Sequence, residues 1–257
     1  MQNIKLIASD LDGTLLLNGR STPQEETLNL IRQITDKGIV FAVASGRQYE
    51  NLRELFAPVK DDIAYICCNG GICVYHGEVI YENFIDKSLA NEIIRDIEST
   101  KDNCVMVSAK GYEAINEKDE GFYRYLIDYV KAKVRRFPDL SEVDEDIFKV
   151  SLYNEYEQLN AKYWEERYKG RCEALTSGSV WIDFIPFYSD KGTALKKFCE
   201  SLRIPRECVM AFGDNDNDIS MLKFAGTPVT MNSAREEIRS YGAFSVNTVN
   251  EVLKKMI

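Results

Sequence analysis

Histidine is almost absent from this chain of 257 residues. The single copy, His76, lies in Tyr75-His76-Gly77-Glu78 between two short apolar segments, a pattern that predicts a hairpin turn. A histidine nucleophile, a Ser-His-Asp triad or a metal site with two histidines would each have to use this one residue. Most mechanisms that depend on imidazole are therefore excluded.

The sequence also lacks CxxC pairs, a signal peptide and apolar segments of membrane-spanning length. Its seven cysteines are odd in number and irregularly spaced, which favours reduced thiols over a disulfide framework or a zinc site. We therefore expect a cytoplasmic protein.

Positive charge is in deficit, with 32 lysines and arginines against 41 aspartates and glutamates and a net charge of -9. An acidic surface repels nucleic acids and anionic membranes, so we expect neither as a partner. A phosphorylated substrate would be repelled as well, unless its binding site supplies a metal ion and a lysine.

Apolar strands alternate with amphipathic helices in both terminal parts of the chain, among them a helix expected to begin at Pro23 and another expected at 233–241. Strands that are apolar on both sides are expected at 4–9, 39–44, 63–68 and 208–212, which predicts a parallel sheet covered by helices. Between 83 and 185 the pattern changes to neighbouring strands with short turns and helices near 88–100, 120–132 and 155–168, which predicts an antiparallel sheet with these helices on one face. We predict an α/β core formed by 1–82 and 186–257, interrupted by an inserted α+β domain at 83–185.

Two carboxylates follow the first predicted strand, in the segment Asp10-Leu11-Asp12-Gly13-Thr14-Leu15. In open α/β sheets, ligands bind beyond the carboxyl ends of the strands. At that position Asp10 can attack phosphorus, and Asp12 can manage the proton of the leaving group. Aspartate and glycine also favour turns, so this motif taken alone is explained as well by turn formation.

A hydroxyl and a lysine form the next two clusters. Ser45-Gly46-Arg47 directly follows the strand at 39–44, where a hydroxyl and backbone N–H groups suit a phosphate oxygen, although an ordinary turn explains them too. Lys191 stands in the first turn of a predicted helix, where the helix dipole disfavours a cation. It is either a solvated surface lysine or a cation that a binding site requires.

The fourth cluster, Gly213-Asp214-Asn215-Asp216-Asn217-Asp218, directly follows the apolar strand at 208–212. Its carboxylate and amide oxygens suit a hard cation. Its alternate aspartates have the spacing of an EF-hand calcium loop. However, Ile219 stands where that loop needs glycine, and Ala225 stands where it needs glutamate, so the calcium loop is excluded.

In this order, the four clusters resemble the haloacid dehalogenase (HAD) superfamily of phosphatases, with a Rossmann-like core. Further segments resemble its Cof-type branch (type IIB), in which a cap domain is inserted between the second and third motifs. These segments are Asn69-Gly70-Gly71, Lys191-Gly192-x-Ala194-Leu195, Gly213-Asp214-x-x-Asn217-Asp218-x-x-Met221 and Met231-Asn232-Ser233-Ala234. Two positions depart from the usual pattern, Asn215-Asp216 and Ser233, and neither carries a reacting group.

The resemblance implies a role for each carboxylate. Asp10 would be the nucleophile, and Asp12 would be the general acid and base. Asp12 must then be protonated in the first step, so we expect an environment that raises its pKa. Asp10, Asp214 and the backbone carbonyl of Asp12 would bind Mg²⁺, with Asp218 in the outer shell or holding Lys191.

The resemblance also implies that Ser45, the Gly46 backbone, Lys191 and Asn217 hold the transferring phosphoryl group. The predicted function is a magnesium-dependent phosphatase that hydrolyses a small phosphorylated metabolite through an aspartyl-phosphate on Asp10. A sugar phosphate is the first choice of substrate, followed by pyridoxal phosphate or a flavin-precursor phosphate. The turns near 110–112 and 176–179 are candidates for selecting it.

Two alternatives remain open. A phosphomutase of the same fold would return the phosphoryl group to its substrate. A signalling receiver would store phosphate on an aspartate without turnover, but receivers lack a second aspartate two residues after the first and need no inserted domain of this size.

Overall fold

The computed structural model describes residues 3–130, 132–155, 159–176 and 180–257. The chain divides into two compact units, of which the first comprises Met1–Glu82 and Ser189–Ile257 and the second comprises Asn83–Tyr188. The first is an α/β unit around a mainly parallel sheet and the second is an α+β unit, so the predicted fold class is confirmed.

The first unit contains an eight-stranded sheet in the order β14-β13-β12-β1-β2-β3-β4-β5. Its strands are β1 (Leu6–Asp10), β2 (Val40–Ala44), β3 (Ala64–Cys67), β4 (Ile72–Tyr75), β5 (Glu78–Glu82), β12 (Val209–Gly213), β13 (Thr227–Met231) and β14 (Phe244–Val246). All pairs from β14 to β3 are parallel, whereas β4 and β5 add an antiparallel hairpin at one edge. Every residue of β1 and β12 is buried, as expected for strands covered on both faces.

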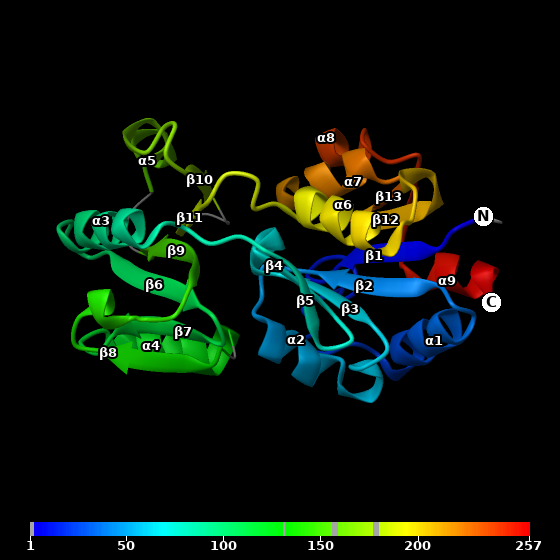
Figure 1. Ribbon diagram of the computed structural model, residues 1–257, viewed down its shortest axis with the longest axis horizontal. Helices are drawn as coiled ribbons and strands as arrows, with labels where there is room; N and C mark the ends of the chain where they lie inside the picture. The colour runs from blue at the N-terminus through cyan, green and yellow to red at the C-terminus, as the bar shows by residue number, and fades with distance from the viewer. Residues whose placement is uncertain (1–2, 131, 156–158, 177–179) are drawn as a thin grey trace. The chain divides into compact units, whose positions relative to one another are not determined.

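Helices cover both faces of this sheet (Figure 1). They are α1 (Glu25–Asp36), α2 (Tyr49–Leu55), α6 (Lys191–Leu202), α7 (Ile219–Phe224), α8 (Glu236–Arg239) and α9 (Asn250–Met256). On the face covered by α6 and α7, Leu195 and Phe198 join Ala8 and Ile66 in one apolar cluster. On the opposite face, α1 packs beside α9.

The sheet order decides where the polar clusters meet. β1 lies between β12 and β2, with Asp10 paired in register with Ala44 and Ser9 paired with Phe212. Because these strands are parallel, their carboxyl ends lie at one edge of the sheet. The segments that follow β1, β2 and β12 are therefore neighbours, although up to 200 residues separate them.

The hairpin predicted at His76 is present, in the part of the sheet farthest from β12. Tyr75 pairs with Glu78, and the two residues between them, His76 and Gly77, have φ angles of 50° and 78°. Two successive positive φ angles are the signature of the tight turn that matches strand twist. His76 thus has a structural position in a turn.

The second unit contains a six-stranded sheet in the order β10-β11-β9-β6-β7-β8. Its strands are β6 (Cys104–Ala109), β7 (Tyr112–Asn116), β8 (Val134–Phe137), β9 (Ile147–Tyr153), β10 (Glu173–Thr176) and β11 (Trp181–Ile185), and its helices are α3 (Lys87–Glu98), α4 (Glu120–Tyr125) and α5 (Ala161–Arg167). All its strand pairs are antiparallel except β7 and β8.

Two expectations for this unit were wrong. Helical segments pack on both faces of its sheet, because β6 is apolar on both sides: Val105 and Val107 join the cluster beneath α3 and α5, whereas Met106 packs against Phe122 of α4. Strand β8 was not expected at all. It is an exposed edge strand whose central residues are arginines, so it has no apolar pattern to recognise.

No helix within the described ranges is both long and apolar enough to cross a bilayer. Of the turn predicted at 176–179, residues 177–179 lie outside the described residues, as do residues 156–158 of the helix predicted at 155–168.

Candidate active site

The carboxylate of Asp10 is buried at the carboxyl end of β1, with 5% of the residue exposed. Its Oδ1 accepts a hydrogen bond of 2.6 Å from Nζ of Lys191. Its Oδ2 is buried without a hydrogen-bond partner. An unsatisfied buried carboxylate oxygen is costly, so this oxygen is available to a cation or to a reacting group.

Lys191 is completely buried between two carboxylates, Asp10 at 2.6 Å and Asp218 at 2.7 Å. Burial acts to lower the pKa of Lys191, but the two carboxylates outweigh burial and raise it, so the side chain is charged. Its place in the first turn of α6 is secured by Asp190, whose carboxylate accepts from the backbone N–H groups of Gly192 and Thr193 at 2.9 Å. Lys191 is thus a buried site cation, and the surface alternative is wrong.

Asp218 has both carboxylate oxygens engaged. Oδ1 accepts from Lys191, and Oδ2 accepts from the backbone N–H groups of Asp214 and Asn215 at 3.0 and 3.1 Å. Asp218 therefore holds the lysine on one side and shapes the loop after β12 on the other. Of the two positions implied for it, the geometry favours the one in which it holds Lys191.

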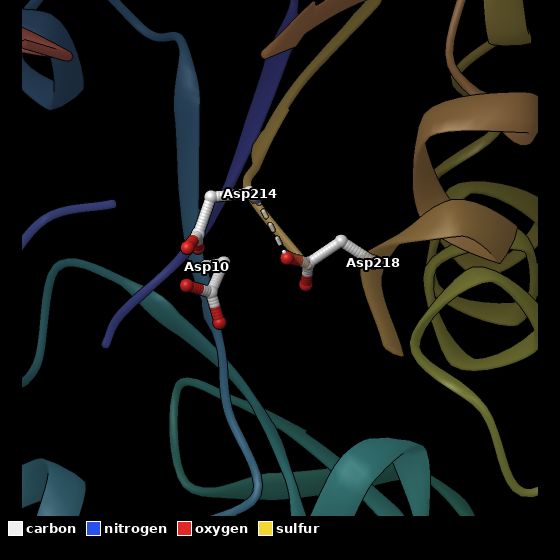
Figure 2. Close-up of side chains that lie close together, drawn as sticks. All are labelled: Asp10, Asp214 and Asp218. Atoms are coloured by element: carbon white, nitrogen blue, oxygen red, sulfur yellow. Dashed lines mark hydrogen bonds between the residues drawn. The ribbon is translucent and has the colours of Figure 1, made fainter. Parts of the chain in front are cut away.

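Asp10, Asp214 and Asp218 converge, each offering an oxygen within 4.8 Å of the others (Figure 2). Oδ1 of Asp214 accepts from the hydroxyl of Thr14 at 2.9 Å. Burial raises the pKa of Asp10 to about 8 although Lys191 opposes the rise, and burial also raises the pKa of Asp214. Three carboxylates facing one lysine leave excess negative charge, which a divalent cation would neutralise.

Gly13, in the turn after β1, allows the carboxylate of Asp214 to lie close to that turn. It has a φ of 95°, and a Cβ atom there would lie 2.4 Å from Oδ2 of Asp214.

We expect Gly13→Ala to reduce turnover at least tenfold and to destabilise the fold by about 1–3 kcal/mol, because the new methyl group displaces Asp214 and strains the backbone. Steady-state kinetics and denaturant unfolding measure both. Gly19→Ala is the matched control: Gly19 has a φ of 70° with open space around it, so it reports backbone strain alone.

Asp12 stands apart from the three converging carboxylates. It lies at the tip of the turn after β1, where its side chain is 54% exposed and accepts two hydrogen bonds from Arg47, at 2.7 and 3.1 Å. This is not the enclosed environment that the sequence led us to expect for a general acid. Three carboxylates therefore converge without Asp12, because the backbone carbonyl of Leu11 accepts from the N–H groups of residues 14–16 and turns Asp12 outward.

Three of the four predicted phosphate-binding residues, Ser45, Gly46 and Asn217, are linked through Asn69. The hydroxyl oxygen of Ser45, a buried residue, accepts from the backbone N–H of Arg47 at 3.2 Å, and the backbone carbonyl of Ser45 accepts from the N–H of Asn69 at 3.0 Å. The Asn69 side chain packs against Gly46, and its Oδ1 accepts from Nδ2 of Asn217 at 3.2 Å. The structure thus brings together the loops that carry Ser45, Gly46 and Asn217.

Sequence reasoning assigned no role to three residues of the site: Thr14, Arg47 and Asn69. They lie in the segments 10–15, 45–47 and 69–71, but the type of each residue did not by itself indicate a role in binding or catalysis. A signal was available for Asn69, because asparagine before two glycines favours the left-handed region, and its φ is indeed 55°. The ion pair of Arg47 with Asp12 had no local signal, since 35 residues separate them.

A family profile described as haloacid dehalogenase-like hydrolase matches residues 7–255. This chain belongs to the haloacid dehalogenase-like hydrolases. The phosphatase YwpJ of Bacillus subtilis (strain 168) is 29% identical to it over 266 residues, which covers 92% of each chain. The 5-amino-6-(5-phospho-D-ribitylamino)uracil phosphatase YcsE of the same organism is 29% identical over 247 residues, which covers 96% of this chain and 91% of YcsE.

A solved sugar phosphatase of HAD subclass IIB shares the fold of this HAD hydrolase, with a TM-score of 0.80, 21% identity and coverage of 98% of both chains. The prediction of a HAD superfamily hydrolase, and with it of an enzyme, is therefore confirmed, and the relatives YwpJ and YcsE are themselves phosphatases.

Proposed function

We propose that this HAD hydrolase is a magnesium-dependent phosphatase that hydrolyses a small phosphorylated metabolite through an aspartyl-phosphate on Asp10. One observation carries the proposal. Asp10 ends the central strand with one carboxylate oxygen held by a fully buried lysine and the other oxygen buried without a partner.

The first step transfers the phosphoryl group to Asp10. A carboxylate oxygen of Asp10 bonds to phosphorus as the bond to the leaving oxygen breaks, and Asp12 gives its proton to the departing alkoxide. In the second step a water molecule attacks the same phosphorus, Asp12 takes a proton from it, and phosphate leaves as Asp10 is regenerated. Lys191 stays charged throughout and offsets the charge of the phosphoryl oxygens.

The carboxylates fit Mg²⁺. Hard oxygen donors are what this ion prefers, and the unpartnered Oδ2 of Asp10 lies in a group whose oxygens are within 4.8 Å of one another. Asp10 and Asp214 would hold the ion, with the backbone carbonyl of Asp12 as the family resemblance implies. When bound, Mg²⁺ neutralises carboxylate charge and polarises a phosphoryl oxygen. We assign Asp218 to Lys191, because both its oxygens are already engaged.

Arg47 positions Asp12. Its guanidinium grips the Asp12 carboxylate through two hydrogen bonds and contacts Asn51 at 3.4 Å. This fork fixes the direction of an otherwise exposed carboxylate. Because both carboxylate oxygens of Asp12 accept from Arg47, Asp12 must be released from Arg47 before it can exchange a proton with the substrate. Arrival of a phosphate, which competes for the same guanidinium, supplies that release.

Removal of metal tests the role of the acidic cluster. We expect EDTA to abolish turnover and Mg²⁺ to restore it, because the excess negative charge around Asp10 repels phosphate without the ion. Hydrolysis of p-nitrophenyl phosphate, followed before and after chelation, measures this. Full activity in the presence of the chelator would remove the metal from the proposal.

Binding of the ion is also expected to stabilise the fold. Mg²⁺ should raise the melting temperature of the wild type but not that of Asp214→Asn, which lacks one of the carboxylates proposed to hold the ion.

The second unit, Asn83–Tyr188, is proposed as the cap that selects the leaving group. A sugar phosphate is our first choice of substrate. The flavin-precursor phosphate named for YcsE is the second, because that relative aligns along nearly the whole chain. A panel of phosphorylated metabolites, compared by kcat/KM, ranks these two classes.

Steady release of phosphate separates the phosphatase from its alternatives. A receiver would stop after one phosphate per chain, and a phosphomutase would give an isomeric phosphate ester in place of inorganic phosphate. Quantifying both products over many turnovers distinguishes the three.

A further inference from the structure

The turn between β3 and β4 has an unusual backbone. Cys68, Asn69 and Gly70 follow one another with φ angles of 52°, 55° and 98°. The left-handed region is unfavourable for any residue that has a Cβ atom, although asparagine tolerates it better than most. Two such residues in succession persist only where the surrounding structure holds them, and strain of this kind gathers at functional sites. The backbone therefore indicates that this turn does more than connect two strands.

The turn is packed against two segments of the candidate active site. The backbone N–H of Asn69 donates to the carbonyl of Ser45 at 3.0 Å. At Gly70, a Cβ atom would lie 2.2 Å from the carbonyl oxygen of Asp190, the residue before Lys191. The turn is thus held by both the loop after β2 and the start of α6, which accounts for the persistence of its strained conformation.

The side-chain amide of Asn69 contacts two residues that are predicted to bind phosphate. A Cβ atom at Gly46 would lie 3.1 Å from Oδ1 of Asn69 and 3.3 Å from its Nδ2, so the amide covers that glycine. Oδ1 of Asn69 also accepts from Nδ2 of Asn217 at 3.2 Å. Asn69 is partly buried, whereas Asn217 is exposed. The more enclosed side chain therefore restrains the more exposed one.

This hydrogen bond fixes which way the amide of Asn217 points. An amide can present either its NH₂ group or its oxygen in a given direction. The NH₂ group has two hydrogens, and the bond to Asn69 uses one of them. The other hydrogen can be donated to a phosphoryl oxygen, whereas the reversed amide would present its own oxygen and repel it. Because Oδ1 of Asn69 can only accept, it favours the orientation in which Asn217 donates.

We propose that Asn69 is a positioning residue for the phosphoryl group. Its amide oxygen selects the orientation in which Asn217 donates, and the strained turn holds that oxygen in place. Asn69 acts through Asn217 and takes no part in making or breaking bonds. The inference rests on the proposed function, in which Asn217 and the Gly46 backbone bind the transferring phosphoryl group.

Asn69→Gly separates the role of the side chain from that of the backbone. Glycine adopts the left-handed region without strain, so the melting temperature should stay within about 3 °C of that of the wild type. The variant loses the amide that orients Asn217. We therefore expect its affinity for inorganic phosphate, measured by calorimetry in Mg²⁺, to fall at least about fivefold. The value of kcat/KM for p-nitrophenyl phosphate should fall at least about tenfold.

Arg203→Gly is the matched control for the backbone change. It also replaces an exposed left-handed residue, with a φ of 54°, by glycine, and it lies at the end of α6 away from the phosphate-binding loops. Phosphate affinity and kcat/KM should both be unchanged. Equal losses in Arg203→Gly and Asn69→Gly would show a general effect of glycine and would refute the role of Asn69.

A double-variant cycle with Asn217→Ala tests whether Asn69 acts through Asn217. The Asn69→Gly, Asn217→Ala double variant should bind phosphate as Asn217→Ala does, because the donor that Asn69 orients is already gone. Full additivity of the two losses, or unchanged phosphate affinity in Asn69→Gly, would overturn the inference while leaving the phosphatase in place. A wild type that binds phosphate but never turns over would contradict the proposed function, and a wild type that binds no phosphate would overturn both.

Discussion

Replacing Asp10 with asparagine is expected to abolish phosphatase turnover while the protein stays folded. The change removes the nucleophilic oxygen, so no aspartyl-phosphate can form, and losses of on the order of 10⁴-fold or more in kcat follow when a nucleophile is lost. The fold should survive, because asparagine has nearly the same volume and the buried carboxylate is itself poorly stabilised: its pKa lies near 8. Hydrolysis of p-nitrophenyl phosphate in Mg²⁺ measures the loss, and circular dichroism measures the fold.

Asp36→Asn is the matched control for this experiment. It makes the same chemical change at the exposed end of α1 and should leave kcat unaltered. Retention of more than a few per cent of activity by a folded Asp10→Asn protein would rule out Asp10 as the nucleophile. Trapping of a phosphorylated wild-type chain, but not of the variant, would locate the intermediate directly.

Replacing Lys191 with methionine is expected to cost both activity and stability. The lysine is fully buried and lies 2.6 and 2.7 Å from two carboxylates, so its removal leaves buried negative charge without a partner. Breaking such a buried pair costs about 3–5 kcal/mol in the free energy of unfolding. Turnover should fall by about 10³-fold, because the phosphoryl charge loses the cation that offsets it. Urea denaturation and steady-state kinetics measure the two effects.

A second substitution tests the cause of this instability. In a Lys191→Met, Asp218→Asn double variant, one of the two unpaired charges is gone, so part of the lost stability should return while activity stays low. Additive losses from the two substitutions would contradict the charge explanation. Lys196→Met, an exposed lysine on the same helix, serves as the control and should change stability by no more than about 0.5 kcal/mol.

Much of the first unit follows from local sequence. The apolar segments at β1, β2, β3 and β12 are continuous, and this pattern is typical of strands covered on both faces. The boundaries of the helices were predicted less accurately than the strands. Helix α1 begins at Glu25 and not at Pro23, because Gln24 is still extended, with ψ at 148°. The helix expected at 233–241 contracts to Glu236–Arg239.

The second unit was harder to predict for a physical reason. The helix expected at 120–132 is α-helical only to Tyr125 and continues as a π-helix over Leu126–Val130, a change that packing decides and composition does not signal. The backbone of β8 pairs in parallel with β7, but the side chains of β8 are polar and exposed at its centre, as in many edge strands. Backbone pairing leaves little trace in side-chain sequence.

The sequence by itself determined which chemical groups are available and at which strand ends they stand: carboxylates after β1 and β12, a hydroxyl after β2 and a lysine at the start of α6. Only the tertiary structure decided which groups become partners. Lys191 meets Asp10 across 181 residues of chain, and Asp12 turns away to Arg47. Such contacts depend on the order of strands in the sheet and on the turns that follow them. Both are set by the packing of the whole unit, which no local pattern of residues encodes.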